Sequence, residues 1–481
     1  MNKKLILHLW GVITLVVSVG MLLPLVMTVL TNENRIAEFG IPVLISIAIG
    51  LLLTRGVNPY KGRLALREGM LVISGAFIFV CILGMLPFWL AGFPLIDALF
   101  ESVSGFTTTG ASVLGDLSKI PRELLLWRSL TQWLGGLGII MVFITMVPQV
   151  GREALQLFTG ELHGESAERL LPRITETMKL LAYLYSGFTF TVTLMFFLAG
   201  MDFFEAITHA MAIVSTGGFS IYNDGLRHFN NNAINLVALI CMFIAGGNHV
   251  LYFRSCREGL GRLFKDTEFK AYALLIGVFG LFITINLYSN GFYNLGDSMF
   301  NSFFQTVSIV STSGFAMANY DVWPDFSKYC LFLLMFVGGC SGSTVGGIKM
   351  SRMVILLKLT GQELKRTIHP RMVTTITMTD RIVPSKLIGG ITRFFFIYIT
   401  LFFLSATLLS LVGDLSMFSA AGIAAACLAS VGAAFETVAT ITGYAGLTNG
   451  AKIVAMLTML LGRLEIVTLL VIFNPNFWKK E

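Results

Sequence analysis

A short pattern of hydroxyl residues ending in glycine occurs four times in this chain: Thr107-Thr108-Thr109-Gly110-Ala111, Ser215-Thr216-Gly217-Gly218-Phe219, Ser311-Thr312-Ser313-Gly314-Phe315 and Thr440-Ile441-Thr442-Gly443-Tyr444. Each run lies between two long apolar stretches. Hydroxyl side chains and a glycine that can adopt positive φ allow a backbone to point consecutive carbonyl groups into a narrow pore. A single run of this kind can be an ordinary turn. Four of them predict one selectivity filter built from a fourfold internal repeat.

The composition identifies the medium in which this chain folds. Of its 481 residues 55% are hydrophobic and 13% are charged, and the mean hydropathy is +0.78. These values are far too apolar for a soluble protein and indicate a polytopic membrane protein. The first apolar segment, Leu5 to Leu30, lacks a small-residue cleavage site, so we expect a retained anchor and not a cleaved signal peptide.

Apolar runs of about 20 residues predict membrane spans. Four shorter apolar pieces, each ending in a hydroxyl-glycine run, lie after the third, fifth, seventh and ninth spans. Since such pieces are too short to cross about 30 Å of hydrocarbon as helices, we expect re-entrant half-helices. The ten predicted spans lie near residues 5–30, 39–54, 68–92, 127–148, 176–200, 232–253, 270–290, 329–357, 387–412 and 451–473.

The basic residues predict the orientation. When both termini are placed inside, the inner segments hold most of the 34 Lys and Arg residues. Such a bias is typical of cytoplasmic loops and places all four glycine runs in the outer half of the membrane. The net charge of +7 is then explained by orientation, with phospholipid headgroups as the partner.

These features together resemble the potassium-translocating subunits of the Trk/Ktr/HKT superfamily. The resemblance rests on Ser104-Gly105-Phe106-Thr107-Thr108-Thr109-Gly110-Ala111, on Gly338-Gly339-Cys340-Ser341-Gly342-Ser343-Thr344-Val345-Gly346-Gly347-Ile348-Lys349 and on Gly462-Arg463-Leu464-Glu465. Two extra spans between Leu5 and Thr54 favour the Trk-type branch. The resemblance covers nearly the whole chain.

The resemblance implies an all-α polytopic fold, with four span, pore helix, filter loop, span repeats around a central pore. We expect two extra N-terminal helices in residues 1–66, pore repeats in 67–150 and 151–265, a third repeat with an intramembrane gating loop in 266–360, and a fourth repeat in 361–481.

By resemblance, four glycines line the narrowest external site. A serine at the first of them is associated with sodium permeation in relatives, so glycine at all four favours potassium. The fourth loop departs from the Asn-Asn-x-Gly-Pro-Gly pattern of the branch, and its axial glycine could be Gly443 or Gly446. The predicted potassium-binding residues are Thr108, Thr109, Gly110, Thr216, Gly217, Gly218, Thr312, Ser313, Gly314, Ile441, Thr442 and Gly443.

The eighth predicted span contains five glycines and three hydroxyl residues between Gly338 and Gly347. Glycine costs a helix about 1 kcal/mol relative to alanine, so we expect the helix to break there and line a water-filled cavity. Close helix packing is the alternative explanation for the glycines. By resemblance this segment is a gate, formed by Gly338, Gly339, Cys340, Ser341, Gly342, Ser343, Thr344, Val345, Gly346 and Gly347.

Arg463 is predicted at mid-depth of the last span. Because an arginine there costs at least about 2.5–3.5 kcal/mol to insert, it is a candidate functional residue. It could instead be neutralised by a neighbouring helix or extend to the inner interface. Glu465 is two residues further on and would face the other side of a helix. By resemblance, Arg463 adds an electrostatic barrier beside the gate.

Acidic residues are predicted at the start of two pore helices. Asp97 and Glu205 each lie 13 residues before a filter glycine. A carboxylate at a helix N-terminus interacts with free N–H groups and the positive end of the dipole. We therefore expect both residues to cap their helices.

The inner segments contain no phosphate-binding glycine motif. Any control by nucleotides must then come from a partner. The resemblance implies a homodimer that binds a TrkA-like cytosolic nucleotide-binding protein, in the inner membrane of a bacterium and with both termini cytoplasmic. Potassium is the transported ion, and we expect no organic cofactor.

Three other functions would each need a feature of their own in the sequence. A polytopic membrane enzyme would need catalytic motifs such as HExxH or GxSxG, which the sequence lacks. A proton- or sodium-coupled potassium symporter would need a mid-span acid, and only Glu465 comes near. A less selective sodium and potassium transporter also remains open.

Overall fold

The computed structural model describes residues 2–31, 35–55, 66–138, 167–372, 375–379, 381–436 and 443–479. Within these ranges the chain is helical apart from loops and one small antiparallel hairpin, β1 (Thr377–Met378) and β2 (Arg381–Ile382). The predicted all-α class is confirmed.

In the part of the chain that the structure describes, six helical segments are long and apolar enough to cross a membrane, and all six were predicted. They bury only part of their surfaces against the protein, as expected of helices that face lipid. They are α1 (Lys3–Leu30), α2 (Ile36–Thr54), α3 (Leu66–Gly84) continued by α4 (Leu86–Leu90), α7 (Ala167–Ala199), α11 (Thr267–Ser289) and α15 (Ser385–Gly413).

Two predicted spans are bent and not straight. Helices α9 (Asn232–Ala245) and α10 (His249–Glu258) meet at 93°, after Gly246 and Gly247. Helix α17 (Asn449–Arg463) and the segment formed by α18 (Val467–Leu470) and η8 (Val471–Phe473) meet at 108°. Glu465 and Ile466, at the second bend, have φ of 58° and 47°, which no right-handed helix accepts.

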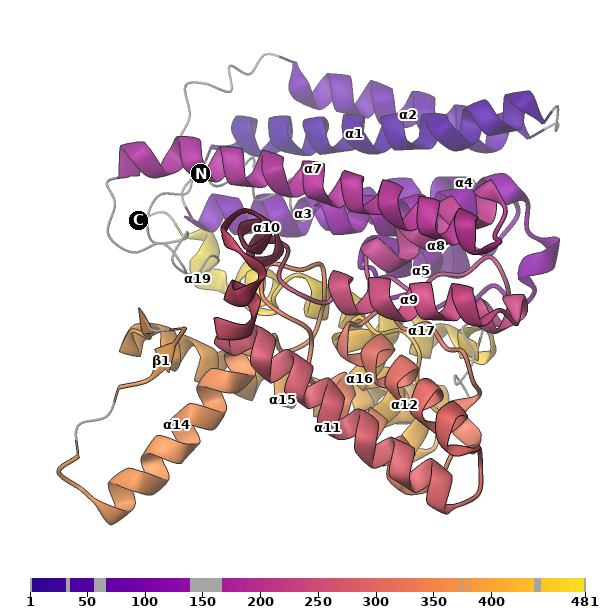
Figure 1. The fold of residues 1–481 in the computed structure, drawn as a ribbon. Coiled ribbons are helices and arrows are strands. Elements are labelled where there is room, and N and C mark those ends of the chain that lie inside the picture. Colours follow the sequence, from indigo (N-terminus) through magenta and orange to yellow (C-terminus); the bar gives the residue numbers. More distant parts are fainter. Residues whose placement is uncertain are drawn as a thin grey trace.

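Of the two remaining predicted spans, one extends beyond the described residues and the other is broken. Residues 122–138 are helical, and the rest of the span predicted at 127–148 lies outside the described residues. The span predicted at 329–357 is broken into α13 (Asp325–Met335) and α14 (Met350–Ile368). Its glycines explain the break, as predicted, and α14 projects away from the helical body (Figure 1).

Four short helices precede the glycine runs. They are 12 to 16 residues long, which at 1.5 Å per residue is about 18–24 Å and less than a membrane span. Short helical turns complete the described fold: η2 (Leu117–Lys119), η3 (Gly225–Phe229), η4 (Leu260–Lys265), η5 (Tyr320–Val322), η7 (Gly443–Gly446) and α19 (Pro475–Trp478). The four short helices are α5 (Leu95–Phe106), α8 (Phe203–Val214), α12 (Leu295–Val310) and α16 (Met417–Leu428).

The short helices have well-defined starts. Asp202 and Glu205 form a capping box at α8, so Glu205 has the predicted role. Asp97 lies in the first turn of α5 as expected, but its carboxylate accepts a hydrogen bond from Lys452 Nζ at 2.7 Å and makes no cap bond. Both termini, α14 and β1 lie at one end of the molecule, whereas α5, α8, α12 and α16 lie toward the other (Figure 1).

Candidate functional site

All four short helices end in the same backbone geometry. One residue after the helical C-cap the chain adopts a left-handed conformation, with φ between 51° and 57°, and the glycine two positions further has φ between 69° and 83°. In each loop the residue between these two donates its N–H to a carbonyl five residues back, at 2.8–2.9 Å. The left-handed residues are Thr108, Thr216, Thr312 and Ser430, and the glycines are Gly110, Gly218, Gly314 and Gly432.

These four glycines form a closed ring, which we call the glycine ring. A Cβ atom on Gly110 would lie 2.0 Å from the carbonyl oxygen of Gly217, and one on Gly218 would lie 2.2 Å from that of Ser313. The same test places Gly314 against the carbonyl of Val431, and Gly432 against that of Thr109. Each glycine thus packs on the backbone of the next loop, and no side chain fits between the four loops.

The prediction that Gly443 is the fourth axial glycine is wrong. Helix α16 ends at Leu428, so the loop that enters the ring is Ser430 to Gly432. Gly443 instead begins η7, where the Tyr444 hydroxyl donates to the Gly432 carbonyl at 2.8 Å. Gly446 has no atom within 4 Å of its Cβ position and does not enter the ring either. Ile441 and Thr442 lie outside the described residues.

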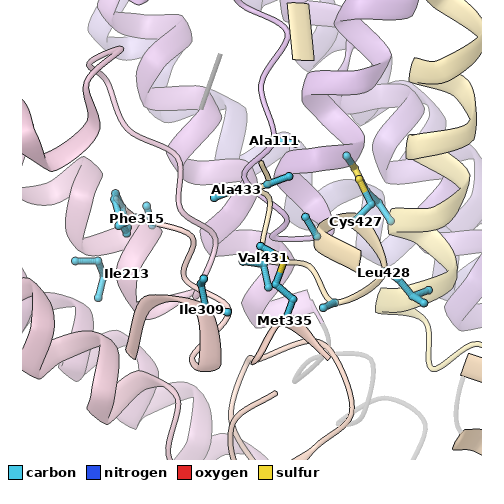
Figure 2. Packing of buried hydrophobic residues seen from close by; sticks show 14 of the residues in the cluster. Ala111, Ile213, Ile309, Phe315, Met335, Cys427, Leu428, Val431 and Ala433 are labelled. Atoms are coloured by element: carbon cyan, nitrogen blue, oxygen red, sulfur yellow. The ribbon is translucent and has the colours of Figure 1, made fainter. Parts of the chain in front are cut away.

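A spacing in the sequence could have identified Gly432. The N-cap residue of the pore helix lies 16 positions before the ring glycine in three of the four loops: Pro94, Asp202 and Ser416. Ser430-Val431-Gly432 also has the hydroxyl-x-glycine pattern, but Ala433 follows where two other loops have phenylalanine. Figure 2 shows Ala433 near Ala111 of the first loop.

The hydroxyl groups of the runs are largely bonded within their own loops. Thr107 Oγ1 lies 2.8 Å from Thr109 Oγ1, and Ser311 Oγ lies 2.9 Å from Ser313 Oγ. Thr216 Oγ1 donates to the Ser215 carbonyl at 2.7 Å. These hydroxyl groups therefore help to hold the loops in shape.

The segment from Gly338 to Gly347, the intramembrane loop, is held by backbone contacts at its base. Val337 and Ile348 form a parallel bridge. The Cys340 N–H donates to the Gly246 carbonyl at 2.8 Å, and a Cβ on Gly339 would lie 2.3 Å from the same oxygen. Glycine is therefore required where the loop crosses the bend between α9 and α10.

The far end of the intramembrane loop contacts three of the four ring loops. Thr344 Oγ1 donates to the Val214 carbonyl and lies 3.2 Å from Thr216 Oγ1. The Gly346 N–H donates to Thr312 Oγ1 at 3.2 Å, and a Cβ on Gly346 would lie 2.2 Å from the Ala429 carbonyl. The ten residues thus form one loop packed against the ring loops. Its remaining side chains are Cys340, Ser341, Ser343 and Val345, of which Cys340 and Val345 are buried.

Arg463 is the last residue of α17, and its side chain contacts the intramembrane loop. Its side chain is buried, and Nη1 donates to the Thr344 carbonyl at 2.6 Å. Among the described residues its Nε and Nη2 have no hydrogen-bond partner. Glu465 pairs with Arg352 Nη2 at 2.6 Å, so the two residues do not pair with each other, as expected. The arginine therefore places a cationic group directly beside the intramembrane loop.

Short re-entrant helices, a ring of four backbone loops and an intramembrane loop define a polytopic membrane protein of the cation-transport class. The family model described as "TrkH: Cation transport protein" matches residues 36–480, and this chain belongs to that family. The predicted resemblance to Trk-type subunits is confirmed.

Relatives of known name agree with this assignment. The chain is 32% identical over 487 residues to the Trk system potassium uptake protein TrkH of Halomonas elongata, with both chains fully covered. It is 32% identical to the TrkG protein of Escherichia coli K12, covering 99% of each chain. The crystal structure of the potassium transporter TrkH from Vibrio parahaemolyticus matches with a TM-score of 0.90 at 32% identity, over the whole of both chains.

Proposed function

We propose that this protein mediates potassium uptake, with the glycine ring as its selectivity filter. The observation that carries the proposal is the ring itself, in which each of four glycines is packed on a backbone carbonyl of the neighbouring loop. Carbonyl oxygens held at fixed spacing can replace the hydration shell of a cation. The relatives named as potassium uptake proteins support potassium as that cation.

Backbone atoms of the four ring loops would coordinate potassium as the transported ion. The predicted set is kept for three loops and corrected for the fourth. The proposed residues are Thr108, Thr109, Gly110, Thr216, Gly217, Gly218, Thr312, Ser313, Gly314, Ser430, Val431 and Gly432.

The intramembrane loop and Arg463 would control passage below the filter. The loop contacts the filter loops through Thr344 and Gly346, and Arg463 holds the Thr344 carbonyl. For the path below the filter to open, the intramembrane loop would have to break these contacts and move. The symporter alternative loses support because Glu465, the acid it needs, is engaged by Arg352.

The site of action would be the bacterial inner membrane, with both termini on the cytoplasmic side. Helix α14 and the β1–β2 hairpin lie at the same end as the termini (Figure 1). Helix α14 exposes Leu357, Leu364 and Ile368 beside Lys365 and Arg366. This end would bind a TrkA-like nucleotide-binding protein, and the subunit would work as a homodimer.

Potassium uptake predicts rescue of growth. A bacterium that lacks its own uptake systems should grow at low external potassium when it makes this chain together with a TrkA-like protein. Uptake of rubidium measured in the same cells separates transport from indirect effects. A chain that reaches the membrane in normal amount without restoring growth or uptake would contradict the proposal.

Control by a partner predicts that nucleotides act only on the complex. A TrkA-like protein should co-purify with this chain, and flux into liposomes should change when ATP, ADP or NAD is added on the inner side. The free energy for opening would come from unequal binding of the partner to the open and closed states. Nucleotide-sensitive flux from the isolated chain would show that control lies within it.

A further inference from the structure

We propose that Arg128, Glu101 and Gln132 form a clamp that sets the spacing between the first and second filter loops and thereby helps to select the ion. The inference rests on the proposed function and adds positioning residues to it. Arg128 and Gln132 lie one turn apart on the helix of residues 122–138, and Glu101 lies on α5. All three side chains come from the first third of the chain.

Arg128 uses all three guanidinium nitrogens on different acceptors. Nε donates to Glu101 Oε2 at 3.1 Å, Nη2 to Ser112 Oγ at 3.1 Å and Nη1 to the Ser220 carbonyl at 3.0 Å. Its Cζ lies over the ring of Phe219, 4.1 Å from the ring centroid. The side chains of Arg128 and Glu101 are 1% and 0% exposed. The guanidinium therefore connects the first loop to the second out of contact with water.

Gln132 binds the second loop closer to the glycine ring. Its Nε2 donates to the Gly217 carbonyl at 2.6 Å, and its Oε1 accepts from the Phe219 N–H at 3.1 Å. The Gly217 carbonyl is the one on which Gly110 of the first loop packs. A shift of Gln132 would move this oxygen and with it the contact between the two loops.

Each of these two loops is also bonded to its own pore helix at the same position. Nine residues before the ring glycine stand Glu101 in α5 and His209 in α8. Glu101 accepts from Ser112 Oγ at 2.6 Å, and His209 Nε2 lies 3.1 Å from Ser220 Oγ. Ser112 and Ser220 follow their ring glycines by two positions. Arg128 therefore connects two loops that are each already hydrogen-bonded to their own pore helix.

The clamp is particular to this junction. One helix follows each ring loop, and these four helices begin at residues 122, 232, 325 and 449. Ten positions after the first residue, the first helix has Gln132. The other three helices have buried methionines there: Met242, Met335 and Met459. Six positions after the first residue, the first helix has Arg128, whereas the other three have the buried apolar residues Ala238, Leu331 and Ala455. Polar groups at two consecutive turns would cost stability in this interior unless they were bonded. Polar side chains occupy these two positions only in the first of the four helices, and each of their nitrogen and oxygen atoms has a hydrogen-bond partner. This indicates a positioning role.

Two substitutions separate positioning from charge. Arg128→Lys keeps a cation beside Glu101, but the single nitrogen of an ammonium cannot reach three separated acceptors. Gln132→Met copies the other three helices and leaves the Gly217 carbonyl without its donor. For purified protein in liposomes we expect each change to lower the potassium-to-sodium flux ratio about three- to tenfold, the worth of one or two such hydrogen bonds.

A second measurement does not depend on which ion is transported. Hydrogen exchange of the backbone in residues 215–222 should become faster in each variant, because Gln132→Met removes the acceptor of the Phe219 N–H and Arg128→Lys loosens the contact with the Ser220 carbonyl. Asp97→Asn is the matched control, since it removes another ion pair of α5, with Lys452, and should leave both the flux ratio and the exchange unchanged.

The outcomes distinguish the two proposals. A wild-type protein that passes sodium as readily as potassium would remove potassium selectivity from the proposed function, and hydrogen exchange alone would then decide the clamp. Wild-type exchange and an unchanged flux ratio in both Arg128→Lys and Gln132→Met would overturn the clamp. Equal changes in Asp97→Asn would also overturn it, because they would reflect general loosening of α5.

Discussion

Replacing Gly432 with alanine is expected to lower potassium uptake about tenfold or more. The new Cβ would lie 2.1 Å from the Thr109 carbonyl oxygen, so the first or the fourth loop must move. The φ of 77° at this position adds about 1–2 kcal/mol for a residue with a side chain. Both effects act on the ring of carbonyl groups. Rubidium uptake by cells and by liposomes measures the loss.

Gly446→Ala is the matched control for this prediction. Gly446 lies 14 positions further along the same segment, in η7, and has open space around its Cβ position. Alanine there should leave uptake within about twofold of the wild type, as is usual for surface substitutions. Normal uptake in Gly432→Ala together with loss of uptake in Gly446→Ala would contradict this prediction. It would indicate that Gly443 or Gly446, and not Gly432, is the fourth filter glycine.

Replacing Arg463 with alanine is expected to raise potassium flux through the isolated chain about tenfold or more. A fixed positive charge costs a passing cation about 2 kcal/mol at roughly 8 Å and an effective dielectric constant of about 20. The substitution also frees the Thr344 carbonyl, so the intramembrane loop loses one of its anchors. Selectivity should persist because the glycine ring is not contacted. Flux of purified protein in liposomes is the measurement.

Two further substitutions identify the cause of such a rise. Arg463→Lys retains the charge but not the guanidinium geometry, so its flux should stay near that of the wild type if charge is the barrier. Arg393→Ala removes an exposed basic residue of another span, α15, and should change nothing. Removal of part of the Gly338–Gly347 loop should also raise flux. Wild-type flux in Arg463→Ala and in the shortened loop would place the barrier elsewhere.

Much of the fold was predictable because it depends on composition and length. Six apolar segments had to become spans, and four shorter segments had to become half-helices. The break between Gly338 and Gly347 followed from the cost of consecutive glycines in a helix. Bends were harder to predict. The 108° bend after α17 occurs at Glu465 and Ile466, which have no local preference for positive φ.

The fourth glycine of the ring could not be predicted from the hydroxyl-glycine pattern alone. Three of its glycines, Gly110, Gly218 and Gly314, were predicted from the hydroxyl-glycine pattern. Both Gly432 and Gly443 follow a hydroxyl residue closely, and any such run can form a turn. Distance along the pore helix distinguishes them, since a 12-residue α16 ends at Leu428. The hydroxyl-glycine pattern alone contains no information about that boundary.

The medium, the spans, the half-helices and three of the four ring glycines could be predicted from the sequence, because these depend on local hydrophobicity, length and backbone freedom. Three features became visible in the folded chain alone: Gly432 completes the ring, the intramembrane loop lies against Thr216 and Thr312, and Arg128 joins the first loop to Ser220. Each of these is a contact between residues far apart in the chain. Such contacts depend on packing geometry between loops, which local patterns do not specify.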